Sequence, residues 1–192
     1  MKIGILGGGQ LAMMMIEKSL KHDIDFIVLD PSHKPPASRY VDCIKSEFED
    51  KKALDKLVGE CNVVTIDFEN VPSGSLKYIE KSIDVFPCPD AVEVCQDRLK
   101  EKVVFEKNNI PTTEFKVVNN ESDLLNAISD LGTDSILKSR KLGYDGKNQI
   151  TIKGTDIEKV WEKSGKVAAI LEKRIDFKVS GVYRSVLTKC FN

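Results

Sequence analysis

The sequence has few of the residues that build metal or disulfide sites. Its two histidines, His22 and His33, are too few for a histidine metal site. The five cysteines are scattered and none forms a C-x-x-C pair, so neither a zinc site nor a disulfide framework is indicated. They are Cys43, Cys61, Cys88, Cys95 and Cys190. This usage predicts a reduced compartment, the cytoplasm.

Long apolar runs and an excess of one charge are also absent. No run approaches the roughly 18 apolar residues of a membrane span, and residues 1–6 lack a signal-peptide core. The net charge is −1, which predicts neither a nucleic-acid surface nor an acidic tail. The composition, 41% hydrophobic and 31% charged, is ordinary for a globular protein. The length allows one large domain or two small ones. We therefore expect no membrane and no nucleic acid as partners.

Strand and helix patterns alternate over residues 1–87, which predicts a Rossmann-like, doubly wound parallel sheet in an α/β fold. Apolar runs predict strands, and amphipathic patterns predict helices. The expected strands are 2–6, 25–29, 62–66 and 84–86, the expected helices are 10–21, 51–60 and 72–81, and residues 31–39 are expected to form a loop.

A second set of elements follows two prolines, Pro87 and Pro89. We expect a helical linker over residues 88–111, helical from about residue 91 to residue 108, and a second domain over residues 112–192. Its expected strands are 114–118, 135–138, 149–152 and 167–171, and its expected helices are 121–131 and 156–164.

A first glycine turn lies between the first strand and the first helix. The sequence from Gly7 to Ala12 fits G-x-G-x-x-A, and Asp30 ends the next strand. This is the dinucleotide fingerprint, with a pyrophosphate at the helix N-terminus and the acid on a ribose hydroxyl. Another phosphate ligand, or a tight turn with no ligand, fits the same residues.

Polar residues follow the strand at 62–66. In doubly wound sheets, ligands bind beyond the carboxyl ends of the strands, so Glu69 could reach a substrate amine or hydroxyl. The alternative is that Glu69 stabilises the N-terminus of the following helix.

A second glycine loop occupies residues 143–149. Two glycines three apart allow a turn whose N–H groups converge on phosphate oxygens, and Lys138 and Lys147 could face one polyphosphate. A solvated hairpin loop is the alternative. Arg98 could add a bidentate phosphate contact or lie on an ion-paired helix face. Glu172 could bind ribose hydroxyls next to a base edge, or be an ordinary charged strand end.

These segments together resemble one family. In order they are GGGQL at 7–11, DFENVP at 67–72, QDR at 96–98, IPT at 110–112, LK at 137–138, GYDGK at 143–147, LE at 171–172 and DF at 176–177. The chain is similar to 5-(carboxyamino)imidazole ribonucleotide synthetase, the ATPase subunit of bacterial phosphoribosylaminoimidazole carboxylase, in the ATP-grasp superfamily. The resemblance covers residues 1 to about 177 and implies a preATP-grasp domain followed by the small lobe of an ATP-grasp domain.

The resemblance implies an ATP-dependent ligase of purine biosynthesis, which carboxylates 5-aminoimidazole ribonucleotide with bicarbonate and uses ATP and Mg²⁺. It also implies a functional link to the mutase subunit, and a homodimer is compatible with it. The ATP-binding positions carried over by motif are Arg98, Lys138, Gly143, Tyr144, Asp145, Gly146, Lys147, Asn148, Gln149, Glu172, Lys173, Arg174 and Ile175. The substrate-binding positions are Gly9, Gln10, Leu11, Glu69, Tyr144, Asp145 and Lys147, of which Asp145 and Lys147 are the expected catalytic residues.

The sequence departs from the family pattern at several points. Met13 stands for a usual arginine and Asn148 for a usual glycine, and Lys178 or Ser180 stands where the family has a nucleotide-contacting glutamate. The large lobe, with its metal carboxylates, is expected to lie outside this chain, so we expect no metal ligands in it and no turnover by it alone. The alternatives are a non-catalytic nucleotide-binding remnant and a dinucleotide-dependent oxidoreductase.

Overall fold

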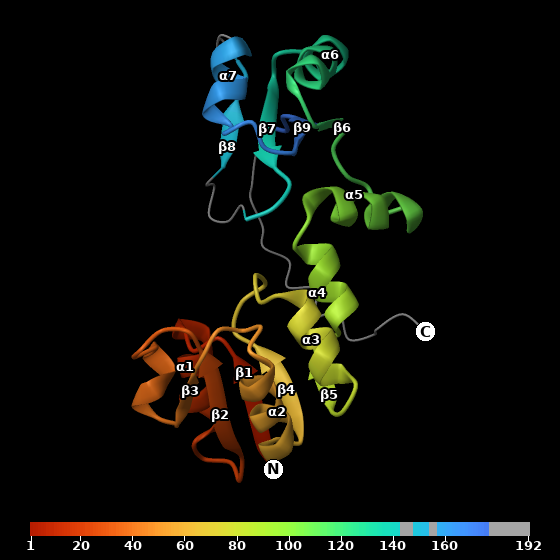
Figure 1. Ribbon diagram of the computed structural model, residues 1–192. Coiled ribbons are helices and arrows are strands. Elements are labelled where there is room, and N and C mark those ends of the chain that lie inside the picture. The colour runs from red at the N-terminus through yellow and green to blue at the C-terminus, as the bar shows by residue number, and fades with distance from the viewer. Residues whose placement is uncertain (143–147, 154–156, 177–192) are drawn as a thin grey trace. The chain divides into compact units, whose positions relative to one another are not determined.

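The computed structural model describes residues 1–142, 148–153 and 157–176. The chain divides into two compact units, Met1–Glu93 and Val94–Asn192. Each unit has its own sheet (Figure 1). No helix in the described ranges is both long enough and apolar enough to span a membrane.

The first unit contains a five-stranded parallel sheet, which confirms the predicted fold class. Its order is β3-β2-β1-β4-β5. The strands are β1 (Lys2–Leu6), β2 (Asp25–Asp30), β3 (Cys43–Lys45), β4 (Val63–Ile66) and β5 (Asp84–Phe86). The helices are α1 (Gln10–Ser19), the 3₁₀ helix η1 (Pro36–Arg39), α2 (Lys51–Glu60) and α3 (Ser73–Glu80), and α4 (Pro89–Cys95) follows β5. Sequence patterns missed β3 and η1.

Alternating side chains place a hydrophobic core on each face of this sheet. Ile5 and Val28 pack with Ala12 and Ile16 of α1 on one face. Leu6, like its neighbours on β2 and β4, packs on the other face against α2 and α3. Because side chains of a strand alternate between its two faces, continuous apolar strands are what a sheet with two covered faces requires.

The second unit contains a four-stranded antiparallel sheet in the order β6-β9-β7-β8. The strands are β6 (Phe115–Val118), β7 (Ser135–Ser139), β8 (Gln149–Thr151) and β9 (Ala169–Lys173), and the helices are α5 (Arg98–Lys107), α6 (Glu121–Leu131) and α7 (Ile157–Lys163). Leu137 and Leu171 pack on one face against Leu124 of α6 and Val160 and Trp161 of α7.

The segment over residues 91–108 is helical as expected and is divided into two helices, because α4 ends at Cys95 and α5 begins at Arg98. Asp97 lies at the break with extended backbone geometry (φ −136°) and accepts a hydrogen bond from the Leu99 N–H. An aspartate in this conformation caps the N-terminus of a helix. The side chain of Asp97 therefore caps the second of the two helices in this segment.

Candidate functional site

The backbone N–H groups of the first glycine turn donate hydrogen bonds to carboxylates of the protein itself. The Gly8 N–H donates to Asp30 Oδ2 (2.7 Å), and the Ser32 N–H donates to Asp30 Oδ1 (2.7 Å). Asp30 is 8% exposed. The acid that the fingerprint assigns to a ribose hydroxyl is thus buried and held inside the fold.

Asp67, at the carboxyl end of β4, occupies the N-terminus of α1. Its Oδ2 accepts from the Gly9 N–H (2.6 Å) and its Oδ1 from the Ala12 N–H (2.5 Å). These donors are the ones that a pyrophosphate would need. A side chain at residue 9 would collide with the Asp67 carboxylate, so glycine is required for this close approach. The geometry therefore disfavours the dinucleotide interpretation of the turn.

The other expected substrate positions of this unit are exposed at the same edge of the sheet. Gln10 and Leu11 begin α1 with exposed side chains, and Glu69 is exposed after β4. The Asn70 side-chain amide donates to Glu69 Oε1 (3.2 Å). The two interpretations of Glu69, as a substrate ligand or as a helix N-terminal acid, both fit this position.

In the second unit, the pairing register decides which face of the sheet carries the charged residues. Leu137 pairs with Leu171, and both pack against α6 and α7. The neighbouring positions, Lys138 and Glu172, therefore point to the opposite face, because successive side chains of a strand alternate. This second face carries the polar groups of the candidate site.

Glu172 lies on this face between two lysines. Its Oε2 is 2.5 Å from Lys138 Nζ and its Oε1 is 3.0 Å from Lys102 Nζ of α5. Glu172 is 7% exposed. Burial raises the pKa of the carboxyl, but the hydrogen bonds from Lys138 and Lys102 outweigh it and hold the pKa below its usual range. Glu172 is therefore ionised at neutral pH.

Lys102 was not among the predicted site residues. Its ammonium also donates to Thr112 Oγ1 (2.5 Å) and lies 5.7 Å from the centre of the Phe115 ring. The segment from Gln96 to Lys102 resembled an ordinary charged helix face, and a helix pattern does not show that one lysine of it is buried. The sequence offered one signal for Lys102. It lies four residues after Arg98 of the QDR segment, and residues four apart lie on the same face of a helix.

A second buried charge pair joins the start of α5 to the end of β7. Arg140 Nε donates to Asp97 Oδ1 (3.0 Å) and Nη2 to Oδ2 (2.6 Å), in a bidentate pair. Burial raises the pKa of Asp97, but Arg140 and the Leu99 N–H outweigh it and lower the pKa below its usual range. Arg98 Nη1 donates to the Ser139 carbonyl (2.8 Å). This arrangement places Arg98 beside the strand that leads into the second glycine loop.

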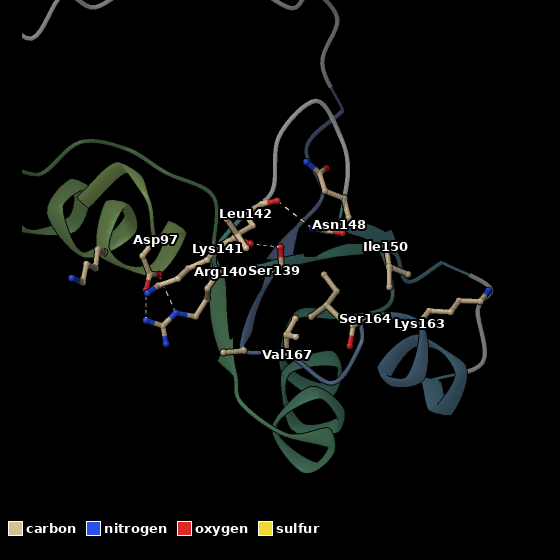
Figure 2. A pocket seen from close by; sticks show the side chains of 14 residues that line it. Asp97, Ser139, Arg140, Lys141, Leu142, Asn148, Ile150, Lys163, Ser164 and Val167 are labelled. Carbon is tan, nitrogen blue, oxygen red and sulfur yellow. Dashed lines mark hydrogen bonds and ion pairs between the residues drawn. The ribbon is translucent and has the colours of Figure 1, made fainter. Parts of the chain in front are cut away.

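A cavity of about 860 Å³ opens at the loop end of the β7–β8 hairpin (Figure 2). Its lining includes both flanks of the glycine loop, where the Asn148 side chain donates to the Leu142 carbonyl (3.3 Å). The lining residues are Asp97, Lys100, Leu137, Ser139, Arg140, Lys141, Leu142, Asn148, Gln149, Ile150, Lys163, Ser164, Val167 and Ala168. Lys138 and Glu172 are not among them, so the cavity and the charged face are separate features of this unit.

Comparison with known proteins gives the family. Residues 1–96 match the ribonucleotide synthetase preATP-grasp domain, and residues 103–182 match the ATP-grasp domain. The chain belongs to the ribonucleotide synthetase family of ATP-grasp proteins. The resemblance to N5-carboxyaminoimidazole ribonucleotide synthetase that the sequence predicted is thereby confirmed.

Three relatives illustrate the match. N5-carboxyaminoimidazole ribonucleotide synthase of Pseudomonas aeruginosa is 33% identical over 178 residues, which cover 92% of this chain and 49% of that protein. The ADP complex of the synthetase from Staphylococcus aureus has a TM-score of 0.87 at 33% identity, covering 92% and 48%. The ATP complex of the synthase from Aspergillus clavatus has a TM-score of 0.83 at 28% identity, covering 92% and 48%. The chain thus spans about half the length of these relatives.

Family membership leaves the individual site residues as predictions. Gly143, Tyr144, Asp145, Gly146 and Lys147 lie outside the described residues. Asn148, where the resemblance leads us to expect glycine, has a left-handed backbone (φ 58°). Asparagine is one of the few residues other than glycine that adopts this conformation readily, so the replacement is compatible with the loop.

Residues 173–175, which the resemblance assigns to the nucleotide base, already use several of their hydrogen-bonding groups within the protein. The Lys173 N–H donates to the Glu114 carbonyl (2.9 Å) and the Arg174 N–H to the Asp134 carbonyl (3.0 Å). The Arg174 side chain pairs with Asp134 (3.6 Å) and Asp176 (2.8 Å). Ile175 is 50% exposed, and its neighbours Lys173, Arg174 and Asp176 are exposed as well.

Proposed function

We propose that this chain contributes the ATP-binding lobe and part of the substrate site of a ligase that converts 5-aminoimidazole ribonucleotide, bicarbonate and ATP into 5-(carboxyamino)imidazole ribonucleotide in purine biosynthesis. The observation that carries the proposal is the charged face of the second sheet, where Lys138 and Glu172 lie on adjacent strands that the ATP-grasp match includes. The relatives solved with ADP and ATP support binding of an adenine nucleotide by this family.

The chemistry proceeds in two displacements. A bicarbonate oxygen attacks the γ-phosphorus of ATP and expels ADP, which gives carboxyphosphate. The exocyclic amine of the imidazole then attacks the carboxyl carbon, phosphate leaves with the electron pair of the C–O bond, and the amine loses a proton. Phosphoryl transfer depends on positioning and on neutralising charge. Lys138 and Arg98 would supply positive charge on the nucleotide side.

The remaining roles follow the family assignment. The loop at 143–149 would cover the phosphates, with Asp145 and Lys147 at the reacting groups, and the segment from Glu172 to Ile175 would hold the adenosine. Gly9, Gln10, Leu11, Glu69 and Tyr144 would face the imidazole ribonucleotide. Mg²⁺, when bound with the nucleotide, would supply positive charge that neutralises the phosphates. No group of three His, Cys, Asp or Glu side chains within the described ranges could hold a metal ion.

The wider setting is proposed on the same ground. Cysteine usage and the family suggest the cytoplasm, and the family suggests a functional link to a mutase subunit and is compatible with a homodimer. Nucleotide binding without turnover is the second candidate, and the observation that favours it is the charged face itself, because the two lysines around Glu172 suit an anion whether or not a reaction follows.

The decisive experiment measures binding and turnover separately. Titration calorimetry of the 192-residue chain with ADP should give saturable binding, and Lys138→Met should weaken it by tenfold or more, since a hydrogen bond to a charged group contributes roughly 1.5–3 kcal/mol. Lys107→Met, an exposed position on α5, is the matched control. No ADP binding, or equal affinity of the two variants, would contradict the assignment of the nucleotide site.

Turnover is then tested as ADP release that depends on both bicarbonate and 5-aminoimidazole ribonucleotide. Release dependent on both assigns the ligase reaction to this chain, and binding without release assigns nucleotide binding alone. Saturable NAD binding that Asp30→Ala abolishes would instead support the oxidoreductase alternative.

A further inference from the structure

The two lysines that share Glu172 are held very differently. Lys102 Nζ donates to Glu172 Oε1 (3.0 Å) and to Thr112 Oγ1 (2.5 Å), and it lies 5.7 Å from the centre of the Phe115 ring. Its side chain is 11% exposed. A cation with an acid, a hydroxyl and an aromatic ring around it is fixed in one position, because each contact restricts the same ammonium.

Lys138 is the more accessible partner. Its Nζ bonds Glu172 Oε2 (2.5 Å), and its side chain is 22% exposed, twice the exposed fraction of Lys102. It also lies on β7, the strand that leads into the glycine loop. Of the two cations, Lys138 is therefore the one that can turn toward a bound phosphate.

Such a movement would be unfavourable if Glu172 had Lys138 as its sole counter-ion. Glu172 is 7% exposed, and a buried carboxylate that loses its cation is strongly destabilised. That penalty would be subtracted from the affinity for the nucleotide. With Lys102 on the other carboxylate oxygen, Glu172 keeps a cation and a hydrogen bond when Lys138 leaves.

We propose that Lys102 is a positioning residue for the nucleotide site: it holds the charge of Glu172, so that Lys138 can move from Glu172 to a phosphate oxygen. The inference rests on the proposed nucleotide function and adds to it a residue that does not touch the nucleotide. Two lysines around one glutamate give this cluster a net charge of +1, which complements an anion.

The reactivity of Lys138 distinguishes this proposal from a purely structural role of Lys102, because the two hypotheses predict opposite changes in that reactivity when Lys102 is removed. If Lys102 only stabilises the fold, its removal loosens the cluster and Lys138 becomes more reactive. If Lys102 shares the charge of Glu172, its removal leaves Lys138 as the sole counter-ion, so Lys138 is held more tightly and becomes less reactive. The rate at which Lys138 is acetylated, followed by mass spectrometry of the free chain, reports this directly.

The variants are Lys102→Met, the milder Lys102→Gln in case the first does not fold, the conservative Lys102→Arg, and the control Lys107→Met on the exposed face of α5. We expect slower acetylation of Lys138 in Lys102→Met or Lys102→Gln, a normal rate in Lys107→Met, and recovery in Lys102→Arg. An unchanged or faster rate would overturn the proposal. This measurement needs no nucleotide, so it stands even where the proposed function fails.

Binding of ADP is the second measurement. We expect Lys102→Met to raise the Kd about tenfold, equivalent to about 1.4 kcal/mol, and Lys102→Arg to restore most of the affinity. In a Glu172→Gln background the same change should have little effect on ADP binding, because residue 172 then has no negative charge that Lys138 or Lys102 must balance. An equal loss of affinity in both backgrounds would overturn the mechanism. Absence of ADP binding by the unmodified chain would count against the proposed function and leave the acetylation result to decide on Lys102.

Discussion

The two glycine-rich segments of this chain lie beside opposite kinds of charge. In the first unit, the N–H groups of Gly8, Gly9 and Ala12 donate to the carboxylates of Asp30 and Asp67. In the second unit, the buried carboxylates around β7 are themselves paired with cations, as Glu172 is with two lysines. The first glycine turn is therefore occupied by carboxylates of the protein, whereas the cluster around Glu172 has one positive charge more than it has negative charges.

This difference shows why a glycine pattern alone does not define a phosphate site. Backbone N–H groups bind an anion only where they have no other acceptor, because buried polar groups in proteins are almost always paired. At the first turn a ligand would have to displace Asp67, which makes two charge-assisted hydrogen bonds. Beside the second loop, the positive charge comes from lysine side chains, and two of them share one carboxylate. An anion could bind there without displacing a carboxylate from backbone N–H groups.

The largest expected effect is on the charge pair between Asp97 and Arg140. Asp97→Ala should lower the free energy of unfolding of the second unit by about 3–5 kcal/mol, since it leaves Arg140 without its buried partner and α5 without its cap. Urea unfolding measures this. Asp90→Ala, whose side chain is 86% exposed, is the control and should change little. A loss equal to that of the control would show that the pair contributes nothing.

Acid should weaken the second unit by titrating its two paired carboxyls. The pKa of Glu172 lies below its ordinary value of 4.5 and that of Asp97 below 3.8. Their contribution is therefore complete above the unfolded values and is lost as the pH falls through the folded ones. Glu101 opposes this in part, because burial raises its pKa and its protonation favours the folded state.

The measurement is the unfolding free energy as a function of pH, for the unmodified chain and for Glu172→Gln. We expect a fall in stability on acidification below the ordinary value of 4.5 for Glu172, with a shallower slope in the variant. Identical slopes would mean that Glu172 is not linked to folding.

A smaller effect is expected at the first glycine turn. Asp67→Ala leaves the Gly9 and Ala12 N–H groups without their acceptor, which should cost about 1–3 kcal/mol. It should also create weak stabilisation by sulfate, because the freed donors lie at a helix N-terminus. Asp67→Asn keeps one acceptor oxygen and should show a smaller loss and less sulfate effect. If sulfate stabilises the unmodified chain as much as it stabilises Asp67→Ala, the Asp67 carboxylate does not prevent anion binding at the turn.

Sequence reasoning succeeded where local patterns decide the structure. The apolar runs of β1 and β2 and the amphipathic helices α2 and α6 have the periodicities that their burial requires. It missed β3, a strand of three residues, Cys43–Lys45, too short to show a period. It gave residues 91–108 as helical but did not show the break at Asp97, which pairs with Arg140 at a separation of 43 residues.

The candidate site shows the same limit. Lys138 and Glu172 were predicted from their motifs, but their contact joins residues 34 apart, and the pairing of Lys102 with Glu172 joins residues 70 apart. The bond between Asp67 and Gly9 spans 58 residues. The folded structure brings these groups together from different helices, strands and turns, so the sequence could name the motif residues and could not show which of them neutralise one another.

The smallest expected effect tests whether the two units fold independently. Ile79 of α3 and Ile128 of α6 are buried in separate cores. The same change, Ile→Val, removes one methyl group from each and should cost about 0.5–1.5 kcal/mol. Calorimetry should resolve two transitions, with Ile79→Val lowering one midpoint and Ile128→Val the other. For domains of 60–100 residues, 1 kcal/mol corresponds to about 4–8 °C, so the shifts are measurable. Both variants lowering one common transition would mean that the units unfold together, and the contrast between their glycine segments would then lie within one cooperative structure.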